Sequence, residues 1–584
     1  MDDIETPSWA AGYERTAQAG LPAIARGAPR TAAEAVRWAW RASPRLTVLA
    51  AIVQLVSGGV TAFGLLATAN VFTQLLEQGP TPTRVVAALP AIAAVVAAGA
   101  ARGLLDATVG AVDGVLTPRV EQVAQHEIHA AVLAVDLVAF EDADFAEHVE
   151  RATMLGPSRL RAIVRDTSDL IAGVVAVTAA VVTAGVLHPL LVPVVLLAAL
   201  PQGWATVRSA RLMFASVVRM NSRSRRIGVV QRLITGRDGA AEIRAFTTQE
   251  VLLGEHRRIG EDLAAEEEVR VSRTRTLIQL VGRTLSGVGT ALAYLVLGLL
   301  LYTGVLPLAL AGAAAVAMRT ASGAVTNVIF QTNHLYEASF YVDLFRTCLA
   351  DARRRRRPEP TAELAGDPAT ITLDGVSFRY PDQDELALDG IDATLRRGEI
   401  VALVGENGSG KSALAKLISG LYLPTGGAVS WDGVCTTALD THDLHSRVAV
   451  VMQEPLRWPM TAENNVRIGR LAATDPDGER LTAAAGRSGA DDVVAELPDG
   501  WSTVLSRMFQ SGRDLSGGQW QRISAARGLY RDAPLVIADE PTAALDARVE
   551  HAVFAACASS VAATGSPFSS PTAWPTSATP TRYW

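Results

Sequence analysis

At 584 residues the chain is too long for one ordinary domain, and a mean hydropathy of +0.23 with 19% charged residues is unusual for a soluble protein. The formal net charge of −6 gives no electrostatic basis for binding nucleic acid. Its three cysteines are widely spaced, so they predict neither a disulfide framework nor a zinc site. These properties direct attention to a membrane component.

The first 44 residues are predicted to be cytoplasmic. Residues 1–32 lack the apolar core of a cleaved signal peptide, and we expect them to be loose. Residues 33–43 combine Trp38 and Trp40 with Arg37 and Arg41, a composition that suits a short helix lying at the membrane interface. A soluble amphipathic helix is the open alternative.

Long uncharged runs come next, and most reach the ~20 residues that a helix needs to cross a bilayer. The run over 170–207 is long enough for two crossings, with a natural turn at His188 and Pro189. The run over 284–318 repeats this arrangement and breaks near Pro307. We therefore predict a membrane domain over 45–350 with six spans, at 46–72, 84–107, 168–187, 189–207, 277–302 and 306–330.

The arginines orient these spans. Arginines precede the first span, follow the fourth and follow the sixth, so all fall on one side, which the positive-inside rule makes cytoplasmic. The N-terminus and the C-terminal half are then cytoplasmic, in a multi-pass protein of the cytoplasmic membrane. The polar segments 102–167 and 208–276 are predicted to continue the spans beyond the membrane. Arg319 is hypothesised to line a transport path; a place near the cytoplasmic rim is the alternative.

A linker is predicted at 351–368, and from 369 the pattern changes to short strands. Residues 405–412 read Gly-Glu-Asn-Gly-Ser-Gly-Lys-Ser, behind an apolar run and ahead of a helix-like segment. In G-x-x-x-x-G-K-S the glycines let N–H groups surround a polyphosphate, Lys411 reaches the terminal phosphates and the Ser412 hydroxyl holds Mg²⁺. The motif predicts ATP and Mg²⁺ binding by Gly405, Asn407, Gly408, Ser409, Gly410, Lys411 and Ser412.

Three further segments contain candidate catalytic or nucleotide-binding residues. The apolar strand 535–538 runs into Asp539, which suits Mg²⁺, and Glu540, which suits proton transfer from an attacking water. Residues 515–519 open a helix whose first N–H groups suit a second phosphate contact. Tyr380 ends a strand and offers an aromatic face to adenine, although packing is the commoner role. The second phosphate contact would come from Ser516, Gly517, Gly518 and Gln519.

Together these pieces resemble the ATP-binding-cassette (ABC) family, and a membrane domain ahead of one cassette resembles its exporter-type half-transporters. Residues 405–412, 515–519 and 535–540 match Walker A, the LSGGQ signature and Walker B. The resemblance assigns Gln453 to the Q-loop, with roles in metal binding and catalysis, Asp546 to the D-loop and Tyr380 to adenine stacking. The implied fold is an α-helical six-span membrane domain followed by an α/β P-loop NTPase cassette.

The resemblance also implies a mechanism. ATP is sandwiched between Walker A of one cassette and LSGGQ of another, so the working unit is a dimer in the lipid bilayer. We expect ATP-driven export of a small or amphipathic compound, in a bacterial-type membrane and without a nucleic-acid partner. Because Lys411, Ser516 and Glu540 are all present, a homodimer is favoured, while a heterodimer with a complete partner half-transporter stays open. An importer is disfavoured because its membrane and cassette parts are usually separate chains.

The C-terminal end departs from the family pattern. After Asp546 the family continues to a Thr/Ser-His-Arg strand end, which this chain lacks. Residues 566–584 are rich in Pro, Ser and Thr, and we predict that they cannot supply a central strand, so that the cassette over 369–565 is altered at its end. One hypothesis is a frameshift near Gly565, because permitted codons read from the third base of Ser566 encode Thr-His-Arg. A disordered natural tail is the alternative; either leaves hydrolysis by this chain in question.

Overall fold

The computed structural model describes residues 21–76, 81–187, 226–237, 239–266, 273–305, 307–539, 567–570 and 582–583, with a few single positions between 189 and 208. The chain forms two compact units. The first contains residues 1–133 and 147–351, and the second contains residues 134–146 and 352–584. The short segment 134–146, which joins two long helices of the first unit, therefore packs with the second.

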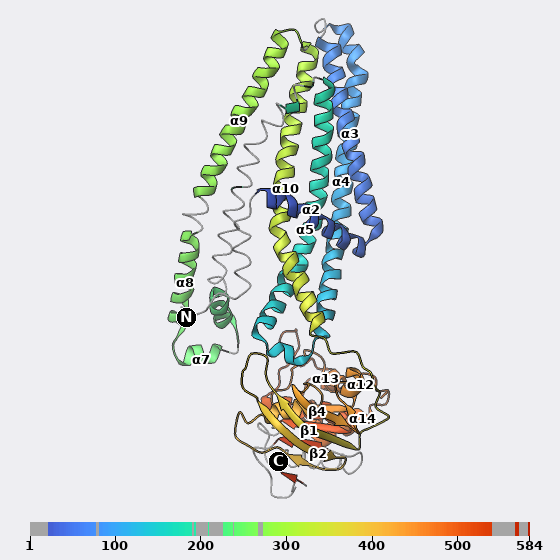
Figure 1. The fold of residues 1–584 in the computed structure, drawn as a ribbon, viewed down its shortest axis with the longest axis vertical. Helices are drawn as coiled ribbons and strands as arrows, with labels where there is room; N and C mark the ends of the chain where they lie inside the picture. Colours follow the sequence, from blue (N-terminus) through green and yellow to red (C-terminus); the bar gives the residue numbers. More distant parts are fainter. Residues whose placement is uncertain are drawn as a thin grey trace. The chain divides into compact units, whose positions relative to one another are not determined.

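The first unit consists of helices (Figure 1). They are α2 (Leu21–Ala42), α3 (Pro44–Leu76), α4 (Pro82–Leu133), α5 (Ala143–Leu187), α7 (Ala240–Ala245), α8 (Gln249–Glu266), α9 (Arg273–Tyr302) and α10 (Leu308–Arg354). Among the described residues, five helices, α3, α4, α5, α9 and α10, are long and apolar enough to cross a membrane. Each coincides with a predicted span, and the predicted span 189–207 lies largely outside the described residues.

Two helices differ in length from a simple span. α4 continues to Leu133 and α5 begins at Ala143, so the polar segment 102–167 is helical on both sides of a short break, as predicted. α2 begins at Leu21, which corrects the expectation that residues up to 32 are loose. The reason is packing, because one face of α2 is buried: Trp38 is 6% exposed while Trp40 is 52% exposed.

The buried residues that the structure describes in the first unit form two hydrophobic clusters. One joins α2, α4, α5 and α10 through residues such as Ile128, Leu160 and Phe345. The other joins α3, α5, α9 and α10 through Leu65 and a set of alanines. Small residues let helices approach closely: a Cβ added to Gly156 would lie 2.3 Å from the Phe345 ring. The bundle is thus held by close packing of alanine, glycine and large apolar side chains.

The described residues of the second unit form two sheets. β1 (Thr370–Phe378), β2 (Leu388–Arg396), β4 (Gly426–Trp431) and β5 (Val434–Cys435) form an antiparallel sheet in the order β2-β1-β4-β5. β3 (Val401–Ala402), β6 (Val448–Val451), β7 (Leu535–Asp539), β8 (Pro567–Ser570) and β9 (Arg582–Tyr583) form a parallel sheet in the order β6-β7-β8-β3-β9. Both sheets and helix α11 (Lys411–Ile418) share one core.

The prediction that residues 566–584 cannot supply a central strand is wrong. β8 pairs in parallel with β7 on one side, where Ile537 lies opposite Phe568, and with β3 on the other, where Val401 lies opposite Phe568. Pro567 is the first residue of the strand, a position where the missing N–H is tolerated. The sheet therefore keeps a member between β7 and β3, although this segment supplies no histidine.

A separate group of helices packs around its own apolar cluster, which includes Trp520, Ile523 and Tyr530. It consists of α13 (Ala462–Arg467), α14 (Glu479–Ser488), α15 (Ala490–Ala495) and α16 (Gly517–Arg531). α12 (Thr441–Ser446) lies beside β6. The second unit thus offers a strand-based part and a helical part, and these carry different motifs.

Candidate nucleotide site

The site is placed by the parallel sheet. β3, β6 and β7 all run in the same direction, so their carboxyl ends lie at one edge. The phosphate-binding loop 405–412 follows β3, Gln453 follows β6 and Asp539 ends β7. The sheet thus brings to one edge three groups that are far apart in the sequence. Glu540 and Asp546 lie outside the described residues, so their roles stay predictions.

Hydrogen bonds within the phosphate-binding loop hold its conformation. The Lys411 ammonium donates hydrogen bonds to the carbonyl oxygens of Gly405 at 2.9 Å and Glu406 at 2.8 Å. The Ser409 N–H donates to the Glu406 carbonyl at 3.2 Å. The ammonium therefore lies across the loop, on the side where its carbonyls gather. Ser412 is exposed in the first turn of α11.

Gly410 determines how closely the loop approaches the neighbouring chain. Its φ is +86°, in the left-handed region, and an added Cβ would lie 2.7 Å from the Ala387 carbonyl oxygen. Gly410 is also the N-cap of α11, and it has no side chain to occupy the first N–H groups of the helix. Those N–H groups, at the positive end of the helix dipole, are suited to an anion.

Tyr380 belongs to a cluster of three rings. Its ring meets Phe378 edge-on at 5.0 Å and Tyr422 edge-on at 6.3 Å, while Phe378 and Tyr422 stack at 5.2 Å. Burial, and next the negative charge of Glu141, raise the pKa of Tyr380. The strand that leads to Tyr380 is tied to Ala387, beside the phosphate loop: the Ala387 N–H donates to the Phe378 carbonyl, and the Ala387 carbonyl oxygen lies close to Gly410. Tyr380 is half-buried, so part of its surface remains accessible.

The signature segment opens α16 with a capping box. The Ser516 hydroxyl accepts from the Gln519 N–H at 3.3 Å, and the Gln519 side chain accepts from the Ser516 N–H at 3.0 Å. The Gln519 amide also donates to Glu496 at 3.2 Å. Gly517 and Gly518 form the first turn of the helix. This segment packs in the helical cluster, whereas the residues that flank the phosphate loop, such as Leu403 and Ala413, belong to the sheet core.

Arg527 joins the signature helix to the segment after Gln453. Its guanidinium donates to the carbonyl of Asn465 at 2.9 Å and to the carbonyl of Leu456. Gln521 of the same helix donates to the Gln453 carbonyl at 3.4 Å. Burial lowers the pKa of Arg527 to about 10. The signature helix and the Gln453 segment are therefore held together by main-chain acceptors, without an acidic partner for Arg527 among the described hydrogen bonds.

The segment 134–146 makes contacts that motif analysis does not reveal. Its 3-10 helix η1 (Leu137–Glu141) ends at Glu141, whose carboxylate accepts from the Tyr422 hydroxyl at 2.5 Å. Lys416, on α11, donates to the same hydroxyl at 2.8 Å and lies 3.6 Å from the Glu141 carboxylate. Glu141 thus contacts both the helix after the phosphate loop and the ring cluster of Tyr380.

Two ion pairs fix the ends of that segment. Asp136 pairs with Arg357 at 3.1 Å and Asp142 pairs with Arg355 at 2.6 Å. Burial alone would raise the pKa of Asp142, but hydrogen bonds from the Phe145 N–H and from Arg355 outweigh it and lower the pKa. The carboxylate is therefore favoured in the folded state. No motif in the sequence marks this segment, and its partners could not be read from the sequence.

Comparison with known proteins decides the family of this site. Residues 388–543 match the family model described as ABC transporter, and this range contains the phosphate loop, Gln453, the signature segment and Asp539. The cassette is an ABC transporter domain.

Relatives of this chain have varied descriptions. The chain is 42% identical over 195 residues to antigen peptide transporter 1 of Rattus norvegicus, covering 32% of this chain and 26% of that protein. It is 40% identical over 201 residues to an ATP-dependent lipid A-core flippase of Chromobacterium violaceum, covering 34% and 33%. It is 42% identical over 199 residues to the mycobactin import ATP-binding/permease protein IrtB of Mycolicibacterium thermoresistibile, covering 34% and 32%. These matches span about a quarter to a third of each relative.

The whole chain is similar in fold to a solved transporter. A bacterial Atm1-family ABC exporter, solved with ATP bound, superposes with a TM-score of 0.68 at 20% identity, over 90% of this chain and 91% of that one. The chain therefore has the fold of a membrane domain fused to an ABC transporter domain. The likeness covers 90% of this chain, so it includes the helical unit as well as the ABC transporter domain.

The ABC transporter domain has the groups that ATP and Mg²⁺ require. The uncapped first turn of α11, the left-handed Gly410 and the Lys411 ammonium form a cradle for phosphates, in which a Cβ at Gly410 would not fit. A hydroxyl, an amide and a carboxylate, from Ser412, Gln453 and Asp539, are oxygen donors of the kind that Mg²⁺ prefers. Bound Mg²⁺ would neutralise charge on the phosphates.

Proposed function

We propose that the protein uses ATP hydrolysis to move a small or amphipathic compound out across the cytoplasmic membrane. The observation that carries this proposal is the sheet edge where the phosphate loop, Gln453 and Asp539 converge, in a chain that also has five membrane-length apolar helices. Glu540, which follows Asp539, would accept the proton of the attacking water. The relatives named as transporters support the same class of function.

The working unit in this proposal is a dimer. Within one chain the phosphate loop and the signature helix pack in different hydrophobic clusters, which suits a signature segment that serves a partner's nucleotide. The Ser516 hydroxyl accepts a hydrogen bond from the helix but keeps its own hydrogen to donate to a phosphate. Closure around ATP and reopening after hydrolysis would alternate the access of the membrane helices.

The test is ATP-dependent transport by the full chain, purified alone and reconstituted in liposomes. We expect ATP hydrolysis that is lost in the Glu540→Gln variant, and accumulation of an amphipathic dye inside vesicles whose cassettes face outward. Efflux into the outer medium instead would indicate import, which the description of one relative as an import ATP-binding/permease protein makes a real alternative.

The heterodimer alternative predicts a different outcome from the homodimer proposal. A subunit that needs a complete partner shows no hydrolysis alone and gains it when co-expressed with that partner. The DNA around Gly565 tests the frameshift hypothesis directly. Codons that cannot encode Thr-His-Arg in the shifted frame would exclude it, and the chain would then act with the β8 strand that it has.

A further inference from the structure

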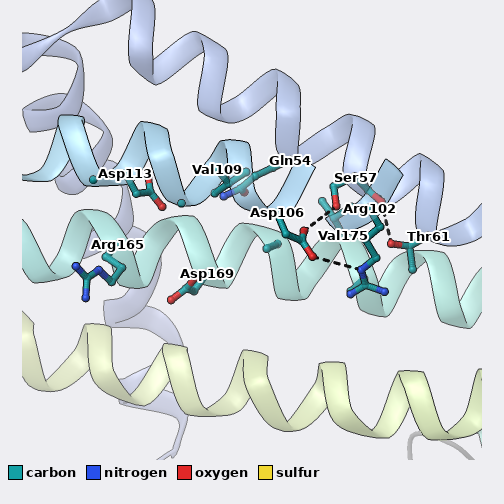
Figure 2. Close-up of a pocket in the computed structure, with 15 residues that line it drawn as sticks. Gln54, Ser57, Thr61, Arg102, Asp106, Val109, Asp113, Arg165, Asp169 and Val175 are labelled. Carbon is teal, nitrogen blue, oxygen red and sulfur yellow. Dashed lines mark hydrogen bonds and ion pairs between the residues drawn. The ribbon is translucent and has the colours of Figure 1, made fainter. Parts of the chain in front are cut away.

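The membrane unit contains a polar cavity between α3, α4 and α5. Its volume is about 440 Å³, which falls in the range of small-molecule sites. Figure 2 shows side chains from all three helices around it, with Gln54 and Ser57 from α3, Asp106 and Asp113 from α4 and Asp169 from α5. These positions lie near the predicted cytoplasmic ends of the second and third spans. A compound could therefore enter from the cytoplasm or the inner leaflet.

The lining carries an excess of negative charge. It contains three aspartates, at 106, 113 and 169, and two arginines, at 102 and 165. Asp106 is already engaged, because Arg102 lies 3.7 Å from its carboxylate and the Ser57 hydroxyl donates to it at 3.3 Å (Figure 2). Asp113 and Asp169 share the remaining Arg165, which interacts with both. Arg102, Asp106 and Asp169 lie within the predicted spans, where ionisable residues commonly mark substrate or ion paths, and Asp113 and Arg165 lie just beyond the cytoplasmic ends of those spans.

Gln54 provides the independent observation that a ligand belongs here. It is 4% exposed, and its Oε1 has no hydrogen-bond partner in the part of the chain that the structure describes. Its Nε2 donates to the Ser168 hydroxyl at 2.5 Å. An unpaired buried acceptor is costly, by about 1–3 kcal/mol in typical cases, so native proteins seldom retain one without a use.

The orientation of the Gln54 amide follows from its neighbours. The Ser168 hydroxyl is hydrogen-bonded to Asp113, and an ionised carboxylate can only accept, so Ser168 must donate its single hydrogen to Asp113. The oxygen of Ser168 is then left to accept from Gln54, which fixes the amide nitrogen on that side. The Gln54 group that has no partner is therefore a carbonyl oxygen, which is buried beside the cavity, and a donor from a ligand would satisfy it.

The rest of the lining is apolar or open. Val109, Val175 and two alanines supply apolar surface. Gly110 and Gly114 line the cavity from α4, and a Cβ built on either has nothing within 4 Å. No close neighbour requires glycine there, and a glycine inside a helix typically costs about 0.5–1 kcal/mol relative to alanine. What the two glycines provide is space along the cavity wall.

From these features we infer that the cavity binds the transported compound and that this compound is an amphipathic organic cation with an N–H donor. The cation balances the excess carboxylate near Asp113 and Asp169, the N–H group satisfies the Gln54 carbonyl, and an apolar body occupies the space beside Gly110 and Gly114. This inference rests on the proposed export function, whose substrate class it specifies.

The test measures binding without nucleotide, by the full chain in phosphatidylcholine nanodiscs. The probe is ethidium, a fluorescent amphipathic cation with aromatic amino groups, and its uncharged dihydro form is the matched neutral ligand. We expect saturable ethidium binding at least about tenfold tighter than binding of the neutral form, the effect of a charged partner in a partly buried site. Equal affinities, or no saturable ethidium binding, would overturn the proposal.

Substitutions locate the site and have effects of opposite sign. Gln54→Leu should weaken both ligands about tenfold, because both carry N–H donors. Asp113→Asn should weaken ethidium alone, whereas Arg165→Gln should tighten it. Opposite changes at two neighbouring positions cannot come from a folding defect, and a loss of affinity in both variants would contradict the charge argument.

The last pair of variants tests whether filling the cavity prevents binding. Gly110→Leu should abolish binding of both ligands, while Gly99→Leu, on the same helix with open space around it but outside the cavity, should leave binding unchanged. Unchanged binding in Gly110→Leu would place the ligand elsewhere. Because these assays contain no ATP, they fail or succeed independently of hydrolysis. Binding without ATPase activity, both in the chain alone and with a partner half-transporter, refutes export, and ATPase activity without binding refutes the cavity proposal.

Discussion

The nucleotide site and the membrane cavity use similar polar groups in different frameworks. At the nucleotide site the phosphate cradle is made by main-chain N–H groups of consecutive residues, and one loop between β3 and α11 supplies most of it. In the cavity the polar groups are side chains from three helices, with Gln54 and Asp169 more than a hundred positions apart in the sequence. A site built from consecutive main-chain groups leaves a sequence motif, and a site assembled from distant side chains does not.

The largest expected effect comes from the lysine of the phosphate loop. Lys411→Ala should lower ATP hydrolysis by at least about 100-fold, the loss typical of removing a donor aimed at developing charge. Phosphate release measures this effect. Ethidium binding to the membrane cavity should not change. A parallel loss of ethidium binding would show that the cavity depends on the nucleotide site, which would contradict the description of the two as separate sites.

The second effect concerns loop geometry, and two glycines with equal φ allow a matched test. Gly410 and Gly398 both have φ of +86°, but only Gly410 has a backbone oxygen, that of Ala387, within 2.7 Å of an added Cβ. Gly398→Ala should lower the free energy of unfolding of the ABC transporter domain by about 1 kcal/mol, and Gly410→Ala by about 2–3 kcal/mol.

Calorimetry of the unfolding of the ABC transporter domain, with and without ATP, measures the stability of both variants. Added ATP should stabilise the Gly398→Ala variant as it does the unsubstituted protein, and should stabilise the Gly410→Ala variant much less. Equal responses to ATP would mean that the close approach of Gly410 to Ala387 plays no part in binding the nucleotide.

The sequence predicted those features that depend on local chain geometry. Five spans, the phosphate loop between a strand and a helix, and the helix that starts at Ser516 all follow from runs of apolar residues or short motifs. The β8 strand was missed because its sequence has low strand propensity, and its pairing with β7 and β3 is decided by tertiary contacts. The partners of Glu141 were missed because they lie far away in the sequence and no motif joins them.

A double-mutant cycle tests one such long-range contact. Glu141→Gln and Tyr422→Phe each remove part of the hydrogen bond between these residues, and we expect a coupling free energy of about 1 kcal/mol, since Tyr422 is buried while Glu141 is partly exposed. The exposed pair Asp343 and Arg346 is the control, with an expected coupling below about 0.5 kcal/mol. Equal coupling free energies in the two pairs would show that the contact between Glu141 and Tyr422 stabilises the protein no more than an exposed ion pair does.

The smallest effect is a pH dependence in the cassette. Burial lowers the pKa of His445 below its ordinary value of 6.5, and the nearby Arg357 and Arg531 act in the same direction, while the Gly420 carbonyl and Asp136 oppose them. The unfolded chain therefore takes up this proton at a higher pH than the folded chain does. The stability contribution is complete above about pH 6.5 and is lost as the pH falls through the folded pKa.

His445→Gln should remove this dependence while keeping a donor for the Gly420 carbonyl, which lies 3.2 Å from Nε2. The thermal midpoint of the cassette, measured from pH 7.5 downward, checks the expectation. The Asp142 carboxyl, whose pKa is lowered from 3.8, affects stability only at more acidic pH. The pH ranges in which His445 and Asp142 change the stability therefore do not overlap. An unchanged slope in His445→Gln would assign the effect to another group.

The contact between Glu141 and Tyr422 joins residues 281 positions apart, and this separation has a consequence for biosynthesis. At about 5–20 residues per second, the segment 134–146 leaves the ribosome roughly 15–55 s before Tyr422 does. During that interval Asp136, Glu141 and Asp142 lack Arg357, Tyr422 and Arg355, the partners that they contact in the folded chain. Because an ionised carboxylate without a partner is costly to bury, these three charges disfavour premature packing of the segment.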